Sequence, residues 1–432
     1  MEELKKKLKG KKIVVLGMGD EGLSTAGIIR DIFPEERLSL ADALPYEKLS
    51  EKAQNFIKEH HSHLDLFFGE DYLQKIDDHD LLIKAPGVPP HIVENLNCEI
   101  TSQTKLFFEF FQGTIVGVTG TKGKSTTVSL IYHILDQAGM DVIKTGNIGT
   151  PALEKLPQTN KNTICVYELS SHQLNDLDQS PHIAVLLPIS PEHLQYHQSF
   201  ENYLAAKSRI TLYQEENDYL FFHPQTLHIA EKSKAKKIEI DESLGREVLK
   251  TAPLAPLYAM NCAVSVQVTE LLGVRGATKL TANFAPLPHR LEPVGEYGGV
   301  IFYNDSAASA PPSTQAALKS LQASTLIAGG YDRGLEWKDL AKSIAESDIE
   351  TLILLPDNGE IIEKEVKKIT KKIEVIMTST LEEAVDLAKK KTKKGGTCLF
   401  SPGAPSFNLF RNYEERGKRF KNLVKAKPTA KA

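Results

Sequence analysis

The sequence is poor in cysteine, nearly balanced in charge and without any long uncharged apolar run. Its four cysteines stand far apart, and none belongs to a CxxC pair, so we expect reduced thiols in a reducing compartment. A formal net charge of −4 argues against a broad nucleic-acid surface. No stretch reaches the ~18 apolar residues of a membrane helix, and no apolar segment follows the first lysines. We therefore expect a cytoplasmic protein with no signal peptide, no membrane span and no nucleic-acid partner.

The 432 residues, of which 41% are hydrophobic and 25% charged, suit a globular chain of about three domains. Apolar runs alternate with helical patterns, which favours parallel sheets covered by helices. We predict an α/β fold with a Rossmann-like domain at 1–102, a central P-loop domain with a mostly parallel sheet at 103–286, and a second Rossmann-like domain at 287–432. The pattern predicts strands at 12–16, 38–40, 64–68, 81–83, 114–118, 164–167, 183–187, 219–223, 300–303, 325–328, 351–355, 374–377 and 397–400, and helices at 23–32, 125–137, 200–212, 257–272, 312–321, 358–369, 380–391 and 409–425.

The most informative segment is Thr-Gly-Thr-Lys-Gly-Lys-Ser-Thr at 119–126, which lies between a predicted buried strand and a predicted helix. A glycine loop that opens a helix directs backbone N–H groups and the helix dipole at an anion. Gly120 and Gly123 let the main chain approach phosphate oxygens. Lys124 can reach the terminal phosphates, and the Ser125 hydroxyl can bind Mg²⁺. The segment therefore predicts a phosphate-binding loop, with a glycine spacing shorter than that of the general P-loop.

An acidic residue follows another predicted central strand. Glu168 ends the apolar run at 164–167. A carboxylate at the end of a buried strand downstream of a P-loop is typical of a residue that binds or positions Mg²⁺. His193 and Lys207 follow the next central strand, and neither is informative by itself.

A second glycine pattern follows the first predicted strand. Gly17-x-Gly19-x-x-Gly22 opens a helix, and Asp42 lies about 20 residues further on, as in a dinucleotide-binding fold. Taken alone, this pattern suggests an NAD enzyme. The same turn can bind any diphosphate at a helix N-terminus. Since the chain already has a nucleotide loop at 119–126, we favour a phosphorylated substrate at the first turn.

These motifs together resemble the Mur ligase family, the ATP-dependent amide-bond ligases of peptidoglycan precursor synthesis. The resemblance covers nearly the whole chain and includes Gly-Asn-Ile-Gly at 146–149, Tyr-Glu-Leu-Ser-Ser-His-Gln-Leu at 167–174 and Ala-Ala-Lys at 205–207. It implies catalytic roles for Lys124, His193 and Lys207. It also implies two Mg²⁺ ions, the first on Ser125 and Glu168 and the second on His193 and a carbamylated Lys207.

The resemblance also implies which residues contact ATP and which contact the substrates. It implies ATP contacts from Gly120, Thr121, Lys122, Gly123, Lys124, Ser125, Thr126, Asn261, Arg290 and Asp305. It implies substrate contacts from Gly19, Asp20, Glu21, Asp42, Asn147, Ser170, Arg333, Ser406, Phe407 and Tyr413.

Within the family, the segments at 401–407 and 411–417 and the compact first domain resemble the members that add D-glutamate. The implied substrates are a UDP-N-acetylmuramoyl-L-alanine-type nucleotide sugar, ATP and D-glutamate, joined through an acyl phosphate by a monomeric enzyme. The acceptor pocket departs from those members, since Ala307 replaces a lysine that contacts the incoming amino acid. A Mur-type ligase for another amino acid therefore stays open.

Three further alternatives remain at this point. A folylpolyglutamate synthase-like ligase has the same ATP core, but such enzymes begin close to their P-loop, whereas about a hundred residues precede it here. A nicotinamide oxidoreductase would use the first domain and leave the P-loop and Glu168 without a role. A P-loop regulator or transporter subunit lacks a recognisable coupling motif.

Overall fold

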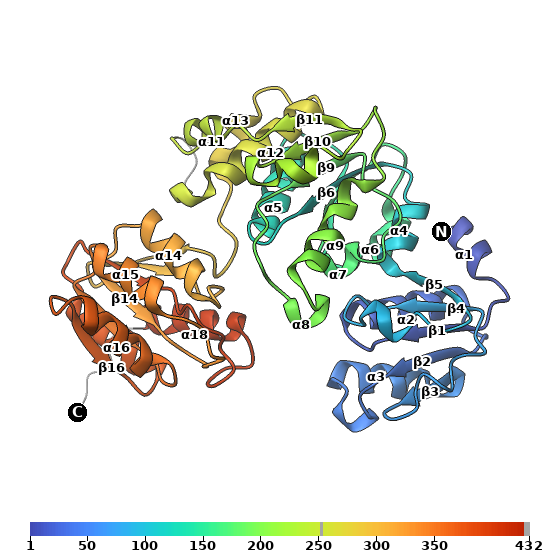
Figure 1. The fold of residues 1–432 in the computed structure, drawn as a ribbon, viewed down its shortest axis with the longest axis horizontal. Helices are drawn as coiled ribbons and strands as arrows, with labels where there is room; N and C mark the ends of the chain where they lie inside the picture. The colour runs from blue at the N-terminus through green and yellow to red at the C-terminus, as the bar shows by residue number, and fades with distance from the viewer. Residues whose placement is uncertain (251–253, 427–432) are drawn as a thin grey trace. The chain divides into compact units, whose positions relative to one another are not determined.

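The computed structural model describes residues 1–250 and 254–426, and its contacts divide the chain into two compact units (Figure 1). The first unit comprises Met1–Gly245 and Met260–Thr281, and the second comprises Arg246–Ala259 and Ala282–Ala432. The first unit holds two sheets and the second holds one. The α/β class with three sheets is confirmed, while the predicted domain boundaries stay predictions.

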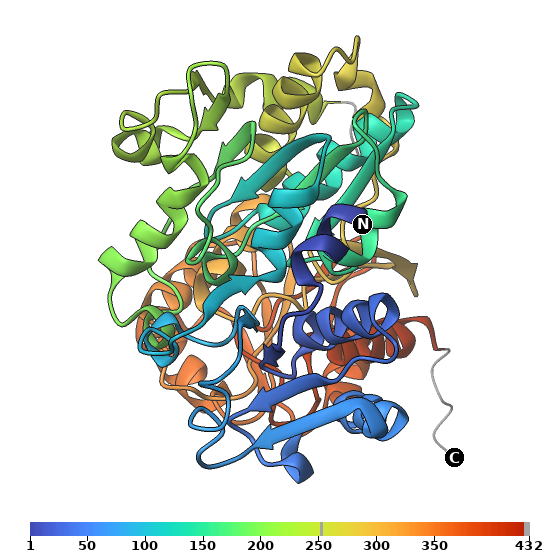
Figure 2. The same cartoon turned by 90° about the vertical axis from the view of Figure 1, so that its right-hand side faces the viewer.

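The N-terminal sheet has five parallel strands in the order β3-β2-β1-β4-β5, coloured blue in Figure 1 and seen from a second side in Figure 2. The helix α2 (Asp20–Ile32) packs on β1 and β2. The chain leaves β1 toward one side and β4 toward the other, so a crevice opens between the loops at their C-terminal ends. The strands are β1 (Ile13–Leu16), β2 (Leu38–Asp42), β3 (Leu64–Phe68), β4 (Leu81–Lys84) and β5 (Glu99–Ser102).

The central sheet has six parallel strands in the order β11-β10-β9-β6-β8-β7. The helix α5 (Lys124–Gln137) packs on β6, β7 and β8, and α9 (Phe200–Leu212) packs on β6 and β9. Since β6 lies between β8 and β9, the loops that follow these three strands meet at one edge. The strands are β6 (Thr114–Thr119), β7 (Val142–Gly146), β8 (Ile164–Glu168), β9 (Ile183–Leu186), β10 (Tyr219–Phe222) and β11 (Lys236–Glu239).

The sheet of the second unit has the order β12-β13-β17-β14-β15-β16. Its pairs are parallel except for β12 with β13, which are antiparallel. The strands are β12 (Glu292–Tyr297), β13 (Val300–Asn304), β14 (Thr325–Ala328), β15 (Thr351–Leu354), β16 (Glu374–Met377) and β17 (Thr397–Phe400), and the longer helices are α14 (Pro311–Ser320), α15 (Lys338–Glu346), α16 (Gly359–Ile369), α17 (Leu381–Lys391) and α18 (Tyr413–Lys425).

Some predicted elements need correction. The last helix begins at Tyr413 rather than at residue 409, because the Asn412 side chain caps it by accepting a 2.8 Å hydrogen bond from the Glu415 backbone N–H. The strands β5, β7, β11 and β12 were not predicted, because charged residues and glycine interrupt their apolar pattern. Among the described helices, none combines the length and apolar character needed to cross a bilayer.

Candidate active site

The phosphate-binding loop has the predicted strand–loop–helix form. β6 ends at Thr119 and α5 begins at Lys124. Gly123 occupies the N-cap position with φ of 90°, in the left-handed region that favours glycine. A Cβ on Gly120 would lie 2.5 Å from the Cβ of Leu187, at the end of the neighbouring strand. The loop therefore requires both glycines, and the first N–H groups of α5 remain available to an anion.

Two lysines lie directly at this loop. Lys124 Nζ donates to the carbonyl oxygens of Gly120 and Thr121, each at 3.0 Å. Lys207, on α9 and only 1% exposed, donates from Nζ to the Gly120 carbonyl at 2.8 Å and to Thr119 Oγ1 at 3.3 Å. Burial, reinforced by the Lys124 charge, holds the pKa of Lys207 well below its ordinary value. Lys207 is therefore biased toward a neutral amine.

Glu168 ends β8 opposite Val118 of β6 and is buried. Its Oε1 accepts a 3.2 Å hydrogen bond from Asn147 Nδ2. Its Oε2 is solvent-inaccessible and has no hydrogen-bond partner within the described residues. A buried carboxylate oxygen left without a donor is costly, and a hard cation such as Mg²⁺ would satisfy it. The predicted Mg²⁺ role therefore fits this side chain.

His193 lies after β9, immediately before the short helix α8 (Leu194–His197), with φ of 55°. Its side chain is half-exposed, and its ring centroid is 5.0 Å from that of His172. Burial of the ring lowers its pKa, against the opposing effect of Glu192. No group of three or more His, Cys, Asp or Glu side chains in residues 1–250 and 254–426 is arranged as a metal site. The predicted sets, Ser125 with Glu168 and His193 with Lys207, each contain one such side chain.

Other predicted ATP residues fix the loop in place. The Asn261 amide donates to the Gly123 carbonyl at 3.1 Å and to Thr127 Oγ1 at 2.9 Å. Thr121 Oγ1 donates to the Ser190 carbonyl at 3.0 Å and also accepts from the Ser190 N–H at 2.8 Å.

The other residues predicted to contact ATP lie nearby. Lys122 is in the loop, and its Nζ pairs with Glu192 at 2.7 Å. Ser125 and Thr126 are in the first turn of α5.

A pocket of about 500 Å³ lies in the crevice of the N-terminal sheet, between the glycine turn after β1 and the loop after β4. Gly19, Asp20, Glu21 and Asp42, four of the residues predicted to contact substrate, are among its lining residues. Asp42 accepts the N–H groups of Met18 at 2.7 Å and Leu44 at 2.8 Å, one on each oxygen. This carboxylate therefore fixes the turn, and a ligand that binds Asp42 has to share oxygens that already accept these two hydrogen bonds.

A second pocket, of about 740 Å³, brings Asp20 and Glu21 together with Asn147 and Ser170. Ser170 also caps the helix α7 (Ser171–Leu174) through a reciprocal capping box with Gln173. Four substrate residues predicted from separate motifs thus line one cavity.

Glu21 is the most perturbed acid of this cavity. Its Oε2 accepts from Gln173 Nε2 at 3.1 Å, whereas Oε1 is buried and finds no partner in the described part of the chain. Burial raises the pKa of Glu21 to about 7, with Gln173 and Lys84 opposing. A carboxyl with this pKa can accept or donate a hydrogen bond near neutral pH.

In the second unit, Asp305 follows β13 and accepts from Ser401 Oγ at 2.7 Å and from the Leu291 N–H at 3.2 Å. Burial raises its pKa to about 7. The carbonyl of Arg290 accepts from the Tyr258 hydroxyl at 2.7 Å, so Tyr258 supports this predicted ATP residue. Arg333 Nη2 contacts the Ser309 carbonyl at 3.4 Å.

The residues of this unit that are predicted to contact substrate differ in solvent accessibility. Ser406 is buried, whereas Phe407 and Tyr413 are exposed. Phe407 lies with its ring centroid 6.3 Å from that of Tyr331. The two exposed rings are accessible to a ligand, whereas the buried Ser406 is not accessible at the surface.

Comparison with known proteins identifies the family. Two family models match: the Mur ligase middle domain over residues 118–252, and the Mur ligase, glutamate ligase domain, over residues 289–403. A UDP-N-acetylmuramoylalanine–D-glutamate ligase from Acetivibrio thermocellus is 33% identical to this chain, over 98% of each. The chain belongs to the Mur ligase family.

A ligase of the same description from Symbiobacterium thermophilum is 32% identical to this Mur ligase, over 94% of this chain and 96% of its own. The fold is also that of the MurF ligase from Thermotoga maritima solved with ADP, with a TM-score of 0.60, 17% identity and 98% coverage of both chains. Family membership removes the nicotinamide oxidoreductase and the P-loop regulator from the alternatives.

The structure of this Mur ligase also shows residues that sequence reasoning missed. Lys84 is 1% exposed and pairs with Asp176 at 2.7 Å while donating to the Val88 carbonyl at 2.6 Å. Its position directly after the apolar run at 81–83 was the sequence feature that could have indicated a buried lysine. Gln173 was visible as the fourth residue of a Ser-x-x-Gln capping box, but its contact with Glu21, 152 positions away, was not.

Arg416 was also missed, although the surrounding segment had been recognised. It is 1% exposed and donates to Ser306 Oγ, the Ser306 carbonyl and the carbonyls of Ala404 and Pro405, at 2.8–3.1 Å. It therefore ties the loop after β13 to the loop after β17.

Proposed function

We propose that this Mur ligase joins D-glutamate to UDP-N-acetylmuramoyl-L-alanine and converts ATP to ADP and phosphate. Full-length similarity, at 33% and 32% identity, to two ligases named for this reaction supports the proposal most strongly. The phosphate-binding loop and the two pockets on the first unit further support it, since they offer separate places for ATP and for the nucleotide sugar.

ATP would be bound by the backbone of the loop at 119–126. The N–H groups at the start of α5 face the site of an anion. Lys124 Nζ lies over the loop, 3.0 Å from two of its carbonyl oxygens, and would neutralise the β- and γ-phosphates. Asn261 would keep the loop in register through its contact with Gly123.

The nucleotide sugar would occupy the two pockets that share Asp20 and Glu21. The uridine diphosphate would lie against the glycine turn after β1, with its sugar and peptide toward Asn147 and Ser170. Asn147 contacts Glu168 directly, so this placement would carry the substrate carboxylate toward the phosphate-binding loop.

Mg²⁺ would be held by Ser125 and Glu168, and a second ion by His193 and Lys207 after carbamylation. When bound, these ions supply the positive charge that allows a carboxylate to approach a polyphosphate. The partnerless Oε2 of Glu168 supports the first assignment.

Carbamylation of Lys207 would require its neutral amine to attack carbon dioxide, forming an N–C bond and releasing a proton. Burial, together with the nearby Lys124 charge, lowers the pKa of this amine, which supports such a step. The product is an anion in place of a cation, and it would offset the positive charge of Lys124.

The reaction would then have two displacement steps. A carboxylate oxygen of the substrate attacks the γ-phosphorus, ADP leaves, and an acyl phosphate forms. The amino nitrogen of D-glutamate attacks the acyl carbon, phosphate leaves, and the nitrogen loses its proton to give the amide. The protein contributes mainly alignment and charge neutralisation, through the loop backbone, Lys124 and the anionic form of Lys207.

We further propose that the enzyme acts as a monomer in the cytoplasm. All four cysteine thiols, each within the described chain, are free, which suits a reducing compartment.

The test is a phosphate-release assay with purified protein, ATP, Mg²⁺, UDP-N-acetylmuramoyl-L-alanine and single D- and L-amino acids, with product masses read by mass spectrometry. We expect release only with D-glutamate and a product heavier by one glutamate residue. The Lys124→Met variant should lose turnover, whereas Lys161→Met, at an exposed lysine, should not. Absence of release with every amino acid would overturn the proposal. Preferential turnover of another amino acid would replace D-glutamate and point to the substitution at Ala307.

A further inference from the structure

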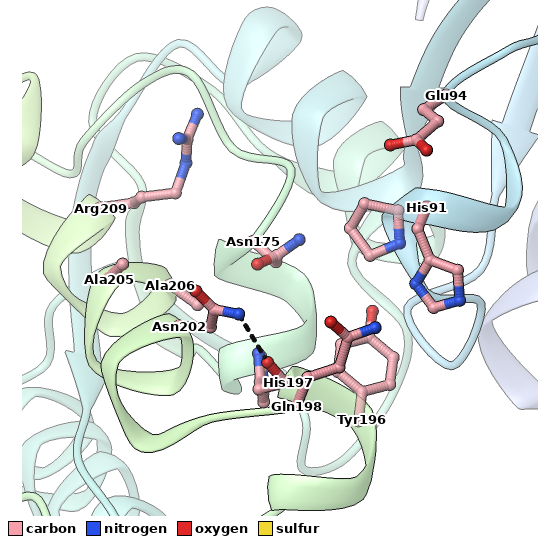
Figure 3. Close-up of a pocket in the computed structure, with 11 residues that line it drawn as sticks. His91, Glu94, Asn175, Tyr196, His197, Gln198, Asn202, Ala205, Ala206 and Arg209 are labelled. Carbon is pink, nitrogen blue, oxygen red and sulfur yellow. Dashed lines mark hydrogen bonds between the residues drawn. The ribbon is translucent and has the colours of Figure 1, made fainter.

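A third cavity of the first unit lies on the side of α9 away from Lys207. It has a volume of about 330 Å³ (Figure 3). Asn202, Ala205, Ala206 and Arg209 line one wall and follow the i, i+3, i+4, i+7 spacing of one helix face. At 3.6 residues per turn, Lys207 projects from roughly the opposite side of the helix. The cavity is therefore distinct from the phosphate-binding loop, although both share α9.

Two opposite charges of this cavity lack ion-pair partners. Arg209 and Glu94 both line it, and neither forms a salt bridge with any residue that the structure describes. In Figure 3 the two side chains lie on opposite sides of the labelled group, with Asn175 between them. A molecule with an anionic end and a cationic end would satisfy both charges.

Arg209 is held in place for such a contact. Its Nε donates to the Leu177 carbonyl at 2.7 Å, its Nη2 donates to the Tyr213 hydroxyl at 2.9 Å, and its guanidinium lies 5.5 Å from the Tyr213 ring centroid. Nη1 has no protein partner in the described residues. A guanidinium fixed in this way loses little conformational freedom on binding a carboxylate.

The middle of the cavity offers amide groups and small side chains. The Asn175 side chain makes no hydrogen bond inside the described part of the chain, so its donor and acceptor can both reach a ligand. Asn202 uses its amide N–H on the His197 carbonyl at 2.9 Å, which leaves its oxygen as an acceptor. Ala205 and Ala206 leave space for short side chains. Paired donors and acceptors of this kind match a peptide group.

From this arrangement we propose that the cavity is an accessory binding site for a dipeptide with free termini and small side chains. Its carboxylate binds Arg209, its ammonium binds Glu94, and its central amide lies at Asn175 and Asn202. The cavity volume is at the lower end of the about 300–1,000 Å³ of small-molecule sites. Because the ligand contacts α9, its binding is linked to the helix that positions Lys207.

The experiment is isothermal titration calorimetry of the full chain, without ATP or nucleotide sugar, using alanyl-alanine of L and D configuration. Free alanine, N-acetyl-alanyl-alanine and alanyl-alanine amide serve as comparison probes. We expect one site for at least one dialanine, and at least about tenfold weaker binding when either terminus is blocked. Free alanine should bind more weakly than the dipeptide because it lacks the central amide that would contact Asn175 and Asn202.

Two variants locate the site. Glu94→Gln keeps the shape but removes the charge, and should weaken the dipeptide at least about tenfold while leaving the affinity of the N-acetyl probe unchanged. Ala205→Leu, at an exposed helical position, should fill the cavity and abolish binding, whereas Ala316→Leu on α14 should not. Thermal melting verifies that both leucine variants are folded.

No heat with either dialanine at about 10 mM, a concentration that would nearly saturate a site with a Kd of about 1 mM, would overturn the proposal. Binding unchanged in folded Ala205→Leu, or binding equal for blocked and free termini, would overturn it as well. Since no catalytic step is measured, failure of the ligase assay would not be mistaken for failure of this site.

Discussion

The side-chain nitrogens of Lys124 and Lys207 donate to the same acceptor, the carbonyl oxygen of Gly120, at 3.0 and 2.8 Å. Two ammonium groups on one acceptor repel each other, and Lys207 is the buried one. Burial and the Lys124 charge lower the pKa of Lys207, which favours the neutral amine that reacts with carbon dioxide. Carbamylation would turn this repulsion into an attraction.

Lys207→Ala should therefore lose ligation on the order of 100-fold or more, and added formate or acetate should restore part of it. A short carboxylate can enter the space left by the side chain and supply the missing negative charge. The readout is phosphate release as a function of acid concentration. Lys232→Ala, at an exposed lysine, should show neither the loss nor the rescue. Equal stimulation of both variants by the acids would contradict the carbamate.

Glu168→Gln should raise the Mg²⁺ concentration for half-maximal turnover by about tenfold or more, because it replaces an anionic oxygen ligand with a neutral amide. The variant keeps the size of the side chain and an acceptor for Asn147. Titration of Mg²⁺ in the phosphate-release assay measures the effect, with exposed Glu201→Gln as the control. An unchanged Mg²⁺ requirement would remove Glu168 from the metal site.

His172→Phe should reduce the acid sensitivity of the fold. Burial and the neighbouring His193 lower the pKa of His172 to about 4, below the ~6.5 of an unfolded histidine. As the pH falls from about 6.5 to 4, the unfolded chain takes up the proton first, so stability is lost across that window. The free energy of unfolding should therefore differ between pH 7 and pH 5 by about 1–2 kcal/mol less in the phenylalanine variant than in the unchanged protein.

Urea denaturation at the two pH values measures this difference. His228→Phe, at an exposed histidine, provides the comparison. An equal loss of unfolding free energy between pH 7 and pH 5 in His172→Phe and in the unchanged protein would contradict a lowered pKa for His172.

Arg416→Lys should destabilise the second unit by roughly 2–4 kcal/mol, because lysine cannot reach all four oxygen acceptors around Ser306, Ala404 and Pro405. Trp337, the single tryptophan of the chain, is buried in this unit, so its fluorescence during chemical denaturation reports the effect. The matched control is Arg419→Lys, at an exposed arginine paired with Glu382, where the change should be small. Equal midpoints for the two variants would contradict the inferred role of Arg416.

The sequence allowed the α/β fold and most central elements to be predicted, because uninterrupted apolar runs form the strands. The strands at 325–328, 374–377 and 397–400 and the helix at 200–212 have the predicted bounds. Edge strands such as β11 (Lys236–Glu239) were not predicted, because their side chains are largely exposed and polar.

The candidate site was predictable only where its residues are local in sequence. The glycine loop carries its own chemistry, whereas Lys207 became informative only through a family resemblance. The contact of Lys207 with Gly120 spans 87 positions, and that of Gln173 with Glu21 spans 152. Such contacts depend on strand order and helix packing, which periodicity does not encode.

Gly120 leaves no room for a side chain, since a Cβ there would lie 2.5 Å from Leu187. An inhibitor that contacts the main chain at Gly120 would therefore bind where any larger side chain has to displace the loop itself or the backbone at Leu187. We therefore expect few viable substitutions of Gly120 itself among variants selected for resistance to such an inhibitor.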